Sequence, residues 1–203
     1  MKSRDKIGLF GGSFDPIHTG HLILAQTAVQ YAGLDKVYFI PTAFPPHKSG
    51  HVMSRFEDRV RMVELAIAGN GRFEISMLEK SDEVSFTWES VAWFAEKGYD
   101  REHLHLLVGG DSLLEMGSWR RPDVIFRNAT IIAMPRPGYT PDMALPDGAS
   151  VILINEGVNS ISSTRIRAIA ASGGSLLYLV PPAVEEYIGS HSLYIDGSEE
   201  EKR

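Results

Sequence analysis

The sequence GGSFDPIHTGH occupies residues 11–21 and joins a strand pattern to a helix pattern. The apolar run Ile7–Phe10 before it predicts a buried strand, and His21–Ala32 after it predicts a helix ended by a glycine. Helix N-termini present unpaired N–H groups and the positive end of the helix dipole, so they attract phosphates. His18 and His21 lie at this junction, where imidazoles can donate hydrogen bonds to phosphoryl oxygens as negative charge builds up.

The alternation of strands and helices continues along the chain. Strands are predicted at Lys6–Phe10, Lys36–Ile40, Phe73–Met77, Leu104–Val108, Thr130–Met134 and Ser150–Ile154. Further helices are predicted from Ser54 to Ala68, with Ser54 and Glu57 as a capping box, from Thr87 to Gly98, from Pro122 to Arg127, from Ser163 to Ala171 and from Pro182 to Ile188. This order predicts a doubly wound, mostly parallel α/β sheet with a small C-terminal helical extension. We expect a single domain over residues 1–203, with residues 155–195 as its C-terminal helical part.

The composition is that of a globular protein, with 203 residues, 43% hydrophobic and 23% charged. The net charge of −6 argues against a broad nucleic-acid surface, and no apolar run has membrane-spanning length. A strand begins almost at the N-terminus, so we expect no signal peptide and a cytoplasmic location. A metal site at the two histidines is disfavoured because no third ligand lies nearby and the chain has no cysteine. Structural hydrogen bonds at a helix start remain the other interpretation of these histidines.

Ligands of doubly wound sheets bind beyond the carboxyl ends of the strands. The loop after the first strand lacks the pattern G-x-G-x-x-G, which disfavours a dehydrogenase. The loop after the second strand reads PPHK at residues 45–48, and Lys48 is a point charge suited to a phosphate, although a loop lysine is usually just solvated. Arg55, Arg59 and Arg61 on the next helix are interpreted as a solvent-exposed face.

Three further residues have a structural interpretation beside a functional one. Thr87 follows Ser85 and Phe86 at a helix start, where ordinary N-capping is the favoured function. Asp111 follows two glycines after the fourth strand, where it would accept from ribose hydroxyls, serve a metal, or cap a helix. Trp119 would either pack in the core or stack on a planar ring.

A second anion-binding pattern lies at residues 161–167, which read ISSTRIR. Three hydroxyl residues open a helix there, and two arginines lie in its first turns. Hydroxyl and guanidinium donors would add to the N–H groups of this helix start. An ordinary N-cap with surface arginines is the alternative.

Residues 11–21 resemble the GG-(S/T)-F-D-P-x-H-x-G-H segment of the nucleotidyltransferase superfamily that carries the H-x-G-H motif. Those enzymes transfer a nucleotidyl group from a nucleoside triphosphate and release pyrophosphate. The order PPHK, SFT, GGD, Trp119, RPG and ISSTRIR, with LVP near the end, is similar to that of the bacterial nicotinate-nucleotide adenylyltransferases. The resemblance covers Ile7 to Tyr194 and implies their Rossmann-like nucleotidyltransferase fold.

The resemblance also implies substrates and residue roles. The partners would be ATP and nicotinate mononucleotide, and the product nicotinate adenine dinucleotide would belong to NAD biosynthesis. Mg²⁺ would be carried by the ATP phosphates, with no metal site of the protein's own. The implied catalytic residues are His18 and His21. The implied ATP-binding residues are Gly11, Gly12, Ser13, Phe14, His18, His21, Asp111, Ile161, Ser162, Ser163, Thr164 and Arg167. The implied acceptor-binding residues are Lys48, Ser85, Phe86, Thr87, Trp119 and Arg136.

The chain departs from the family mildly at Gly109-Gly110-Asp111, where G-(A/Q)-D is common, and more strongly at a second motif. Phe86, Glu89 and Ser90 stand where the family usually has tyrosine, aspartate and threonine in S-Y-T-x-D-T. These positions fall near the expected pyridine pocket, so two alternatives remain: another acceptor, such as nicotinamide mononucleotide or a flavin nucleotide, or a catalytically silent nucleotide-binding module. The intact histidine pair argues against the silent module. Whether the chain forms a homo-oligomer stays open.

Overall fold

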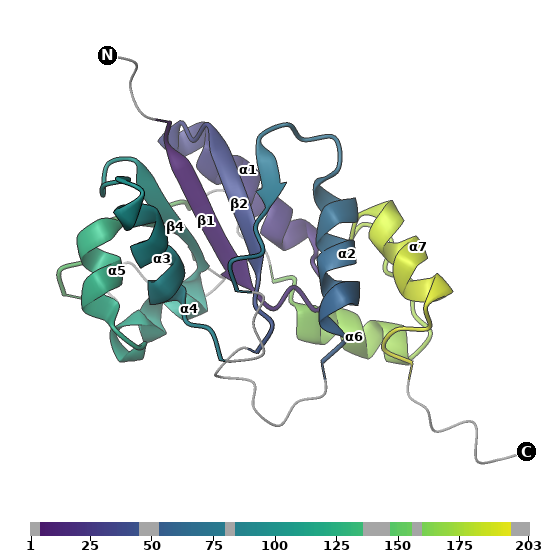
Figure 1. Cartoon of the computed structure of the whole chain (residues 1–203). Helices are drawn as coiled ribbons and strands as arrows, with labels where there is room; N and C mark the ends of the chain where they lie inside the picture. The colour runs from purple at the N-terminus through teal and green to yellow at the C-terminus, as the bar shows by residue number, and fades with distance from the viewer. Residues whose placement is uncertain (1–4, 45–52, 80–83, 136–146, 156–159, 196–203) are drawn as a thin grey trace, which may run out of the picture.

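A parallel sheet of six strands forms the centre of the protein, with helices on both of its faces (Figure 1). The computed structural model describes residues 5–44, 53–79, 84–135, 147–155 and 160–195. The strands are β1 (Ile7–Gly12), β2 (Lys36–Pro41), β3 (Phe73–Ile75), β4 (Leu104–Gly109), β5 (Thr130–Met134) and β6 (Val151–Leu153). They lie in the order β3-β2-β1-β4-β5-β6, and every neighbouring pair is parallel. The predicted doubly wound α/β fold is confirmed, with β3 and β6 shorter than expected.

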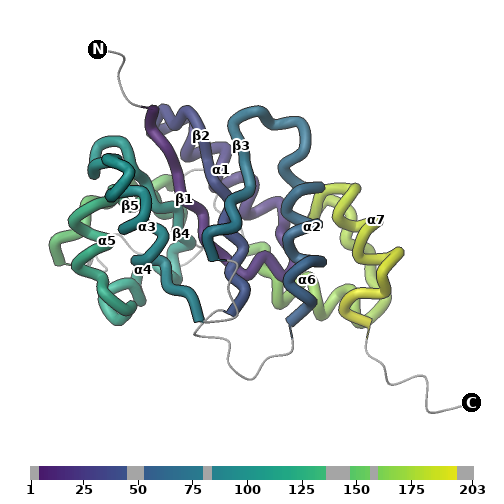
Figure 2. Tube along the Cα trace, in the orientation of Figure 1, coloured from purple at the N-terminus to yellow at the C-terminus, as the bar shows by residue number. Residues whose placement is uncertain are grey.

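The helices divide between the two faces of the sheet. They are α1 (Thr19–Ala32), α2 (Phe56–Ile67), α3 (Thr87–Glu96), α4 (Gly110–Glu115), α5 (Pro122–Asn128), α6 (Ser163–Ala171) and α7 (Pro182–Ser190). Residues of α1, α2, α6 and α7 pack into one buried cluster, and residues of α3, α4 and α5 pack into another. Figure 2 shows α3, α4 and α5 grouped at one end of the molecule and α2, α6 and α7 at the other. None of the described helices is long and apolar enough to cross a membrane.

Along each central strand, alternate residues belong to the two buried clusters. In β5, Ile131 and Ala133 face one cluster, while Ile132 and Met134 face the other. This is the period of two that a strand imposes on its side chains. A strand covered on both faces therefore reads as a continuous apolar run, which is why the strand predictions at the sheet centre hold.

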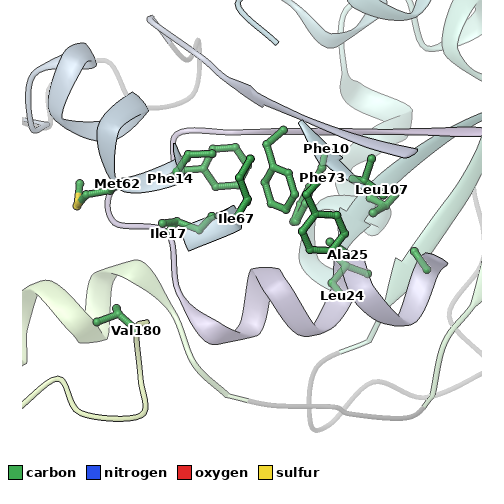
Figure 3. Packing of buried hydrophobic residues seen from close by; sticks show 14 of the residues in the cluster. Phe10, Phe14, Ile17, Leu24, Ala25, Met62, Ile67, Phe73, Leu107 and Val180 are labelled. Carbon is green, nitrogen blue, oxygen red and sulfur yellow. The ribbon is translucent and has the colours of Figure 1, made fainter. Parts of the chain in front are cut away.

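The turn after β1 is anchored in the larger cluster. Phe14 and Ile17 from this turn are 2% and 0% exposed and lie among the core side chains (Figure 3). Phe14 packs edge-on against Phe10, with ring centroids 5.5 Å apart. Its φ of 46° lies in the left-handed region that non-glycine residues rarely adopt. The turn thus has a fixed conformation set by packing, which a phosphate cradle requires.

Several predicted helix starts are wrong in detail. Helix α2 begins at Phe56 and has Arg55 as its N-cap residue, so the predicted capping box of Ser54 and Glu57 is absent. Helix α3 begins at Thr87, so Phe86 is its N-cap residue and the prediction that Thr87 caps it is wrong. The Phe86 N–H donates to Glu89 Oε2 at 2.9 Å instead. Glutamate in the third helical position can reach back in this way, which gives one departure from the family motif a structural role.

The short helix α4 and the 3-10 turn at Met116–Ser118 were missed from the sequence. Two glycines open this stretch, and glycine disfavours a helix. Asp111 lies in the first turn of α4, behind the N-cap residue Gly109, so it does not cap this helix. Helix α1 starts two residues earlier than predicted, which makes His21 its third residue.

Candidate active site

The two helix N-termini singled out in the sequence face one cleft of about 400 Å³ at the carboxyl ends of β1 and β4. The described residues that line this first cavity are Phe10, Gly11, Gly12, Ser13, Phe14, His18, Gly20, His21, Leu24, Leu107, Val108, Gly109, Ser112, Trp119, Met134, Pro135, Ile161, Ser162, Ser163 and Thr164. The cavity therefore joins the segment at residues 11–21 to the one at 161–167. This is the edge of the sheet at which ligands of doubly wound folds bind.

The rings of His18 and His21 stack on one another with centroids 3.6 Å apart and an interplanar angle of 19°. The backbone N–H of His18 donates to Nδ1 of His21 at 3.2 Å. In a neutral imidazole the proton is then on Nε2, which makes His21 a hydrogen-bond donor on its other side. Both rings line the cleft. The arrangement offers donors at the start of α1, where the helix dipole adds positive potential.

The buried Arg59 holds the turn after β1. Arg59 of α2 is 1% exposed, so its prediction as part of a solvent-exposed face is wrong. Its Nη1 donates to the carbonyl oxygens of Ser13 and Thr42 at 2.7 and 2.8 Å. Arg55 and Arg61 are exposed as predicted. Burial lowers the pKa of Arg59, and the negative charge of Asp15 opposes this shift.

The second helix N-terminus is capped within itself and tied to the first. Ser162 is the N-cap residue of α6, and its hydroxyl accepts from the backbone N–H of Arg165 at 3.3 Å. The Ser163 hydroxyl donates to the carbonyl oxygen of Pro16 at 3.0 Å. Arg167 Nη1 donates to the carbonyl oxygen of Asp15 at 2.7 Å. Arg167 is not among the residues that line the cleft, so in this structure it acts on the turn at residues 11–21.

A second cavity of about 240 Å³ adjoins the first. The two share Gly11, Gly12, Ser13, Ser112 and Trp119 as wall residues. The remaining described residues of the second cavity are Thr42, Glu79, Ser85, Phe86, Thr87, Trp88, Arg120 and Ile125. Four predicted acceptor residues thus line one cavity: Ser85, Phe86 and Thr87 at the N-terminus of α3, and Trp119 after the 3-10 turn. Trp119 lines both cavities and also packs against the smaller of the two buried clusters.

Glu79 is a wall residue of the second cavity that sequence reasoning missed. It is 4% exposed and accepts hydrogen bonds from the hydroxyls of Thr42 at 2.7 Å and Ser90 at 3.0 Å. Burial raises its pKa, while the two hydroxyls lower it. No lysine or arginine of the described chain lies within 4.0 Å of its carboxylate. Ser90, one of the departures from the family motif, therefore keeps the hydroxyl that this contact needs.

Other predicted residues lie apart from the two cavities or outside the described part of the chain. Asp111 is exposed and lines neither cavity, whereas its neighbour Ser112 lines both. Lys48 and Arg136 lie outside the described residues. Arg120 was not predicted, yet its guanidinium lies 4.7 Å from the centre of the Phe86 ring at the rim of the second cavity. Trp88 also lines that cavity without having been predicted.

No group of three or more histidine, cysteine or carboxylate side chains within the described ranges could hold a metal ion.

A parallel sheet with two helix N-termini and a histidine pair at one edge is the architecture of an α/β nucleotidyltransferase. The family model described as cytidylyltransferase-like matches residues 9–169. A Pelobacter propionicus protein named "Probable nicotinate-nucleotide adenylyltransferase" is 39% identical over 93% of this chain and 98% of its own length. A Solibacter usitatus relative of the same name is also 39% identical, over 93% of this chain and 99% of its own.

The solved structures agree on the fold. The Plasmodium falciparum nicotinic acid mononucleotide adenylyltransferase complexed with NaAD superposes with a TM-score of 0.81 at 20% identity. The match covers 94% of this chain and 98% of that one. The chain belongs to the cytidylyltransferase-like family and, within it, to the nicotinate-nucleotide adenylyltransferases.

Proposed function

We propose that this protein joins ATP and nicotinate mononucleotide to give nicotinate adenine dinucleotide and pyrophosphate, a step of NAD biosynthesis. The observation that carries the proposal is the pair of adjoining cavities with a common wall, one beneath two helix N-termini and one at the start of α3. Such a pair fits two nucleotides whose reacting phosphates meet at the shared wall. The family membership of the chain supports the same reaction.

The reaction needs positioning more than it needs a base. The phosphate of the mononucleotide is already a nucleophile, so one of its oxygens attacks the α-phosphorus of ATP while the bond to pyrophosphate breaks. Negative charge shifts onto the non-bridging and leaving oxygens during this displacement. Donors fixed in advance at those oxygens stabilise the transition state without reorganisation. His21, through Nε2, and His18 beside it supply such donors at the start of α1.

We assign the first cavity to ATP. Gly11, Gly12, Ser13 and Phe14 would form the cradle, and Ile161, Ser162, Ser163 and Thr164 would close it from the opposite side, because all of them line this cavity. Mg²⁺ would enter with the triphosphate and neutralise its charge while bound to the phosphate oxygens. Asp111 and Arg167 lie outside the lining, so any contact with ATP would need these side chains to turn toward it.

We assign the second cavity to the nicotinate ring. Trp119 would stack on the ring, and Thr87 with the backbone N–H groups at the start of α3 would meet the carboxylate. These donors and the dipole of α3 favour a carboxylate over a neutral amide. Burial raises the pKa of Glu79 and so disfavours its charged form, which reduces the repulsion between Glu79 and a bound carboxylate. Lys48 and Arg136 remain proposed partners of the acceptor.

A direct assay tests the proposal. Purified protein is incubated with ATP and Mg²⁺, and pyrophosphate release is measured with nicotinate mononucleotide, nicotinamide mononucleotide or a flavin mononucleotide as acceptor. We expect the fastest release with nicotinate mononucleotide and formation of one dinucleotide per pyrophosphate. Release with none of the acceptors would support the silent binding module instead. Because both substrates are intracellular metabolites, we also propose a cytoplasmic location.

A further inference from the structure

Asp15 is a buried carboxylate in the middle of the segment at residues 11–21, with 1% of its surface exposed. It lies three residues before His18 and lines neither cavity. Its Oδ1 accepts a hydrogen bond from the hydroxyl of Tyr194 at 2.7 Å. Tyr194 stands 179 residues further along the chain, beyond α7. A buried carboxylate so close to the catalytic histidines, yet outside the substrate cavities, needs a function of its own.

Three other contacts hold the same turn from the C-terminal part of the chain. Arg167 donates to the carbonyl oxygen of Asp15, and Ser163 donates to that of the next residue, Pro16. The backbone N–H of Thr19 donates to the carbonyl oxygen of Leu179 at 2.9 Å. The segment at residues 160–195 therefore holds the turn at Asp15 and at the residues that follow it. Figure 1 shows α6 and α7 together at the end of the molecule that carries these contacts.

The backbone near Tyr194 is strained. Tyr194 has a φ of 65° and Ser192 a φ of 51°, both in the left-handed region. Non-glycine residues keep this conformation only where surrounding contacts demand it. The Tyr194 ring packs against the larger core cluster, and its hydroxyl points to Asp15. Burial and the charge of Asp15 both raise the pKa of Tyr194, so the hydroxyl keeps its proton and remains a donor.

We propose that Tyr194 is a positioning residue for adenylyl transfer: its hydroxyl holds the Asp15 carboxylate and, through it, the turn that carries His18 and His21. The inference rests on the proposed function only where its test measures adenylyl transfer. A phenylalanine would pack against the core equally well, so packing does not account for the hydroxyl. The hydrogen bond to Asp15 does. Small displacements of the donors around a reacting phosphorus lower the rate, because only correctly placed donors stabilise the transition state.

The test removes the hydroxyl and keeps the ring. Tyr194→Phe is compared with Tyr187→Phe, a matched control whose hydroxyl donates to Asp58 at 2.8 Å in the same C-terminal part but away from the turn. We expect Tyr194→Phe to lower kcat about 10-fold or more, with KM for ATP changed less than about 2-fold. Tyr187→Phe should keep the wild-type kcat. Equal kcat values for wild type and both variants would overturn the proposal.

A second pair of measurements separates positioning from loss of stability. In a double-mutant cycle, Asp15→Asn should lower kcat in the wild-type background and add little in the Tyr194→Phe background, because both changes disturb one contact. Additive losses would overturn the proposal. The imidazole resonances of His18 and His21 in NMR spectra should also shift in Tyr194→Phe and not in Tyr187→Phe. Unchanged resonances would refute the positioning role, and this readout remains valid if the wild-type protein transfers no adenylyl group at all.

Discussion

Replacing the buried Arg59 tests how the turn after β1 is held. Arg59→Met keeps an unbranched stem of similar length and removes the guanidinium. The carbonyl oxygens of Ser13 and Thr42, bonded at 2.7 and 2.8 Å, would lose their donor, as would those of Ala43 and Ser54 at 3.2 Å each. Each buried acceptor left without a partner costs about 1–3 kcal/mol. The variant also loses the desolvation cost of a buried charge, which offsets part of this sum.

We therefore expect Arg59→Met to be less stable than wild type by about 2–4 kcal/mol, counting mainly the two shortest bonds. For a chain of this length such a loss corresponds to a Tm lower by about 5–15 °C. The matched control is Arg61→Met on the same helix, whose exposed ion pair with Glu64 should contribute less than about 0.5 kcal/mol. Thermal unfolding followed by circular dichroism measures both. Equal Tm values for the two variants would show that Arg59 does not hold the turn.

Three further predictions concern chemistry and pH. His21→Ala should lower kcat about 10²–10³-fold with little change in Tm, and a variant with near-normal turnover would end the assignment of this ring. Trp119→Ala should weaken the binding of nicotinate and nicotinamide mononucleotide by similar factors. The wild type should prefer nicotinate mononucleotide by about 10-fold or more in kcat/KM. Equal kcat/KM values of the wild type for the two acceptors would refute the pocket assignment. Because the pKa of Glu79 is raised on folding, the native state binds more protons and its stability falls as pH rises above the ordinary glutamate pKa. The Tm of Glu79→Gln minus that of wild type should therefore increase as pH rises above the ordinary glutamate pKa, and a Tm difference independent of pH would contradict the shift.

The sheet was predictable because its strands are covered on both faces. Apolar runs such as Leu104–Val108 leave few alternatives to a central parallel strand. The two helix N-termini of the first cavity were equally predictable, since glycine, hydroxyl residues and histidines lie next to one another in the sequence. Local patterns thus account for most of what surrounds the cleft.

Contacts between distant residues were not predictable from the same patterns. The helical period places Arg59 on the face of α2 that carries Met62 and Val63, but it does not tell that carbonyl oxygens from other segments bind a buried guanidinium there. Glu79 follows β3 with no motif around it, and its two hydroxyl partners lie on different elements. The partner of Asp15 is nearly the whole chain away. Such pairs become visible only when the chain is folded.

The wall between the two cavities has a consequence for ligands that bridge them. Apart from Trp119 it consists of Gly11, Gly12, Ser13 and Ser112, so backbone and small side chains separate the two spaces. A molecule with one base in each cavity needs little room at the crossing. It would lose its rotational and translational freedom once, whereas two separate nucleotides lose theirs twice. A tethered pair of aromatic rings joined by a short anionic linker is therefore a rational starting point for a selective inhibitor.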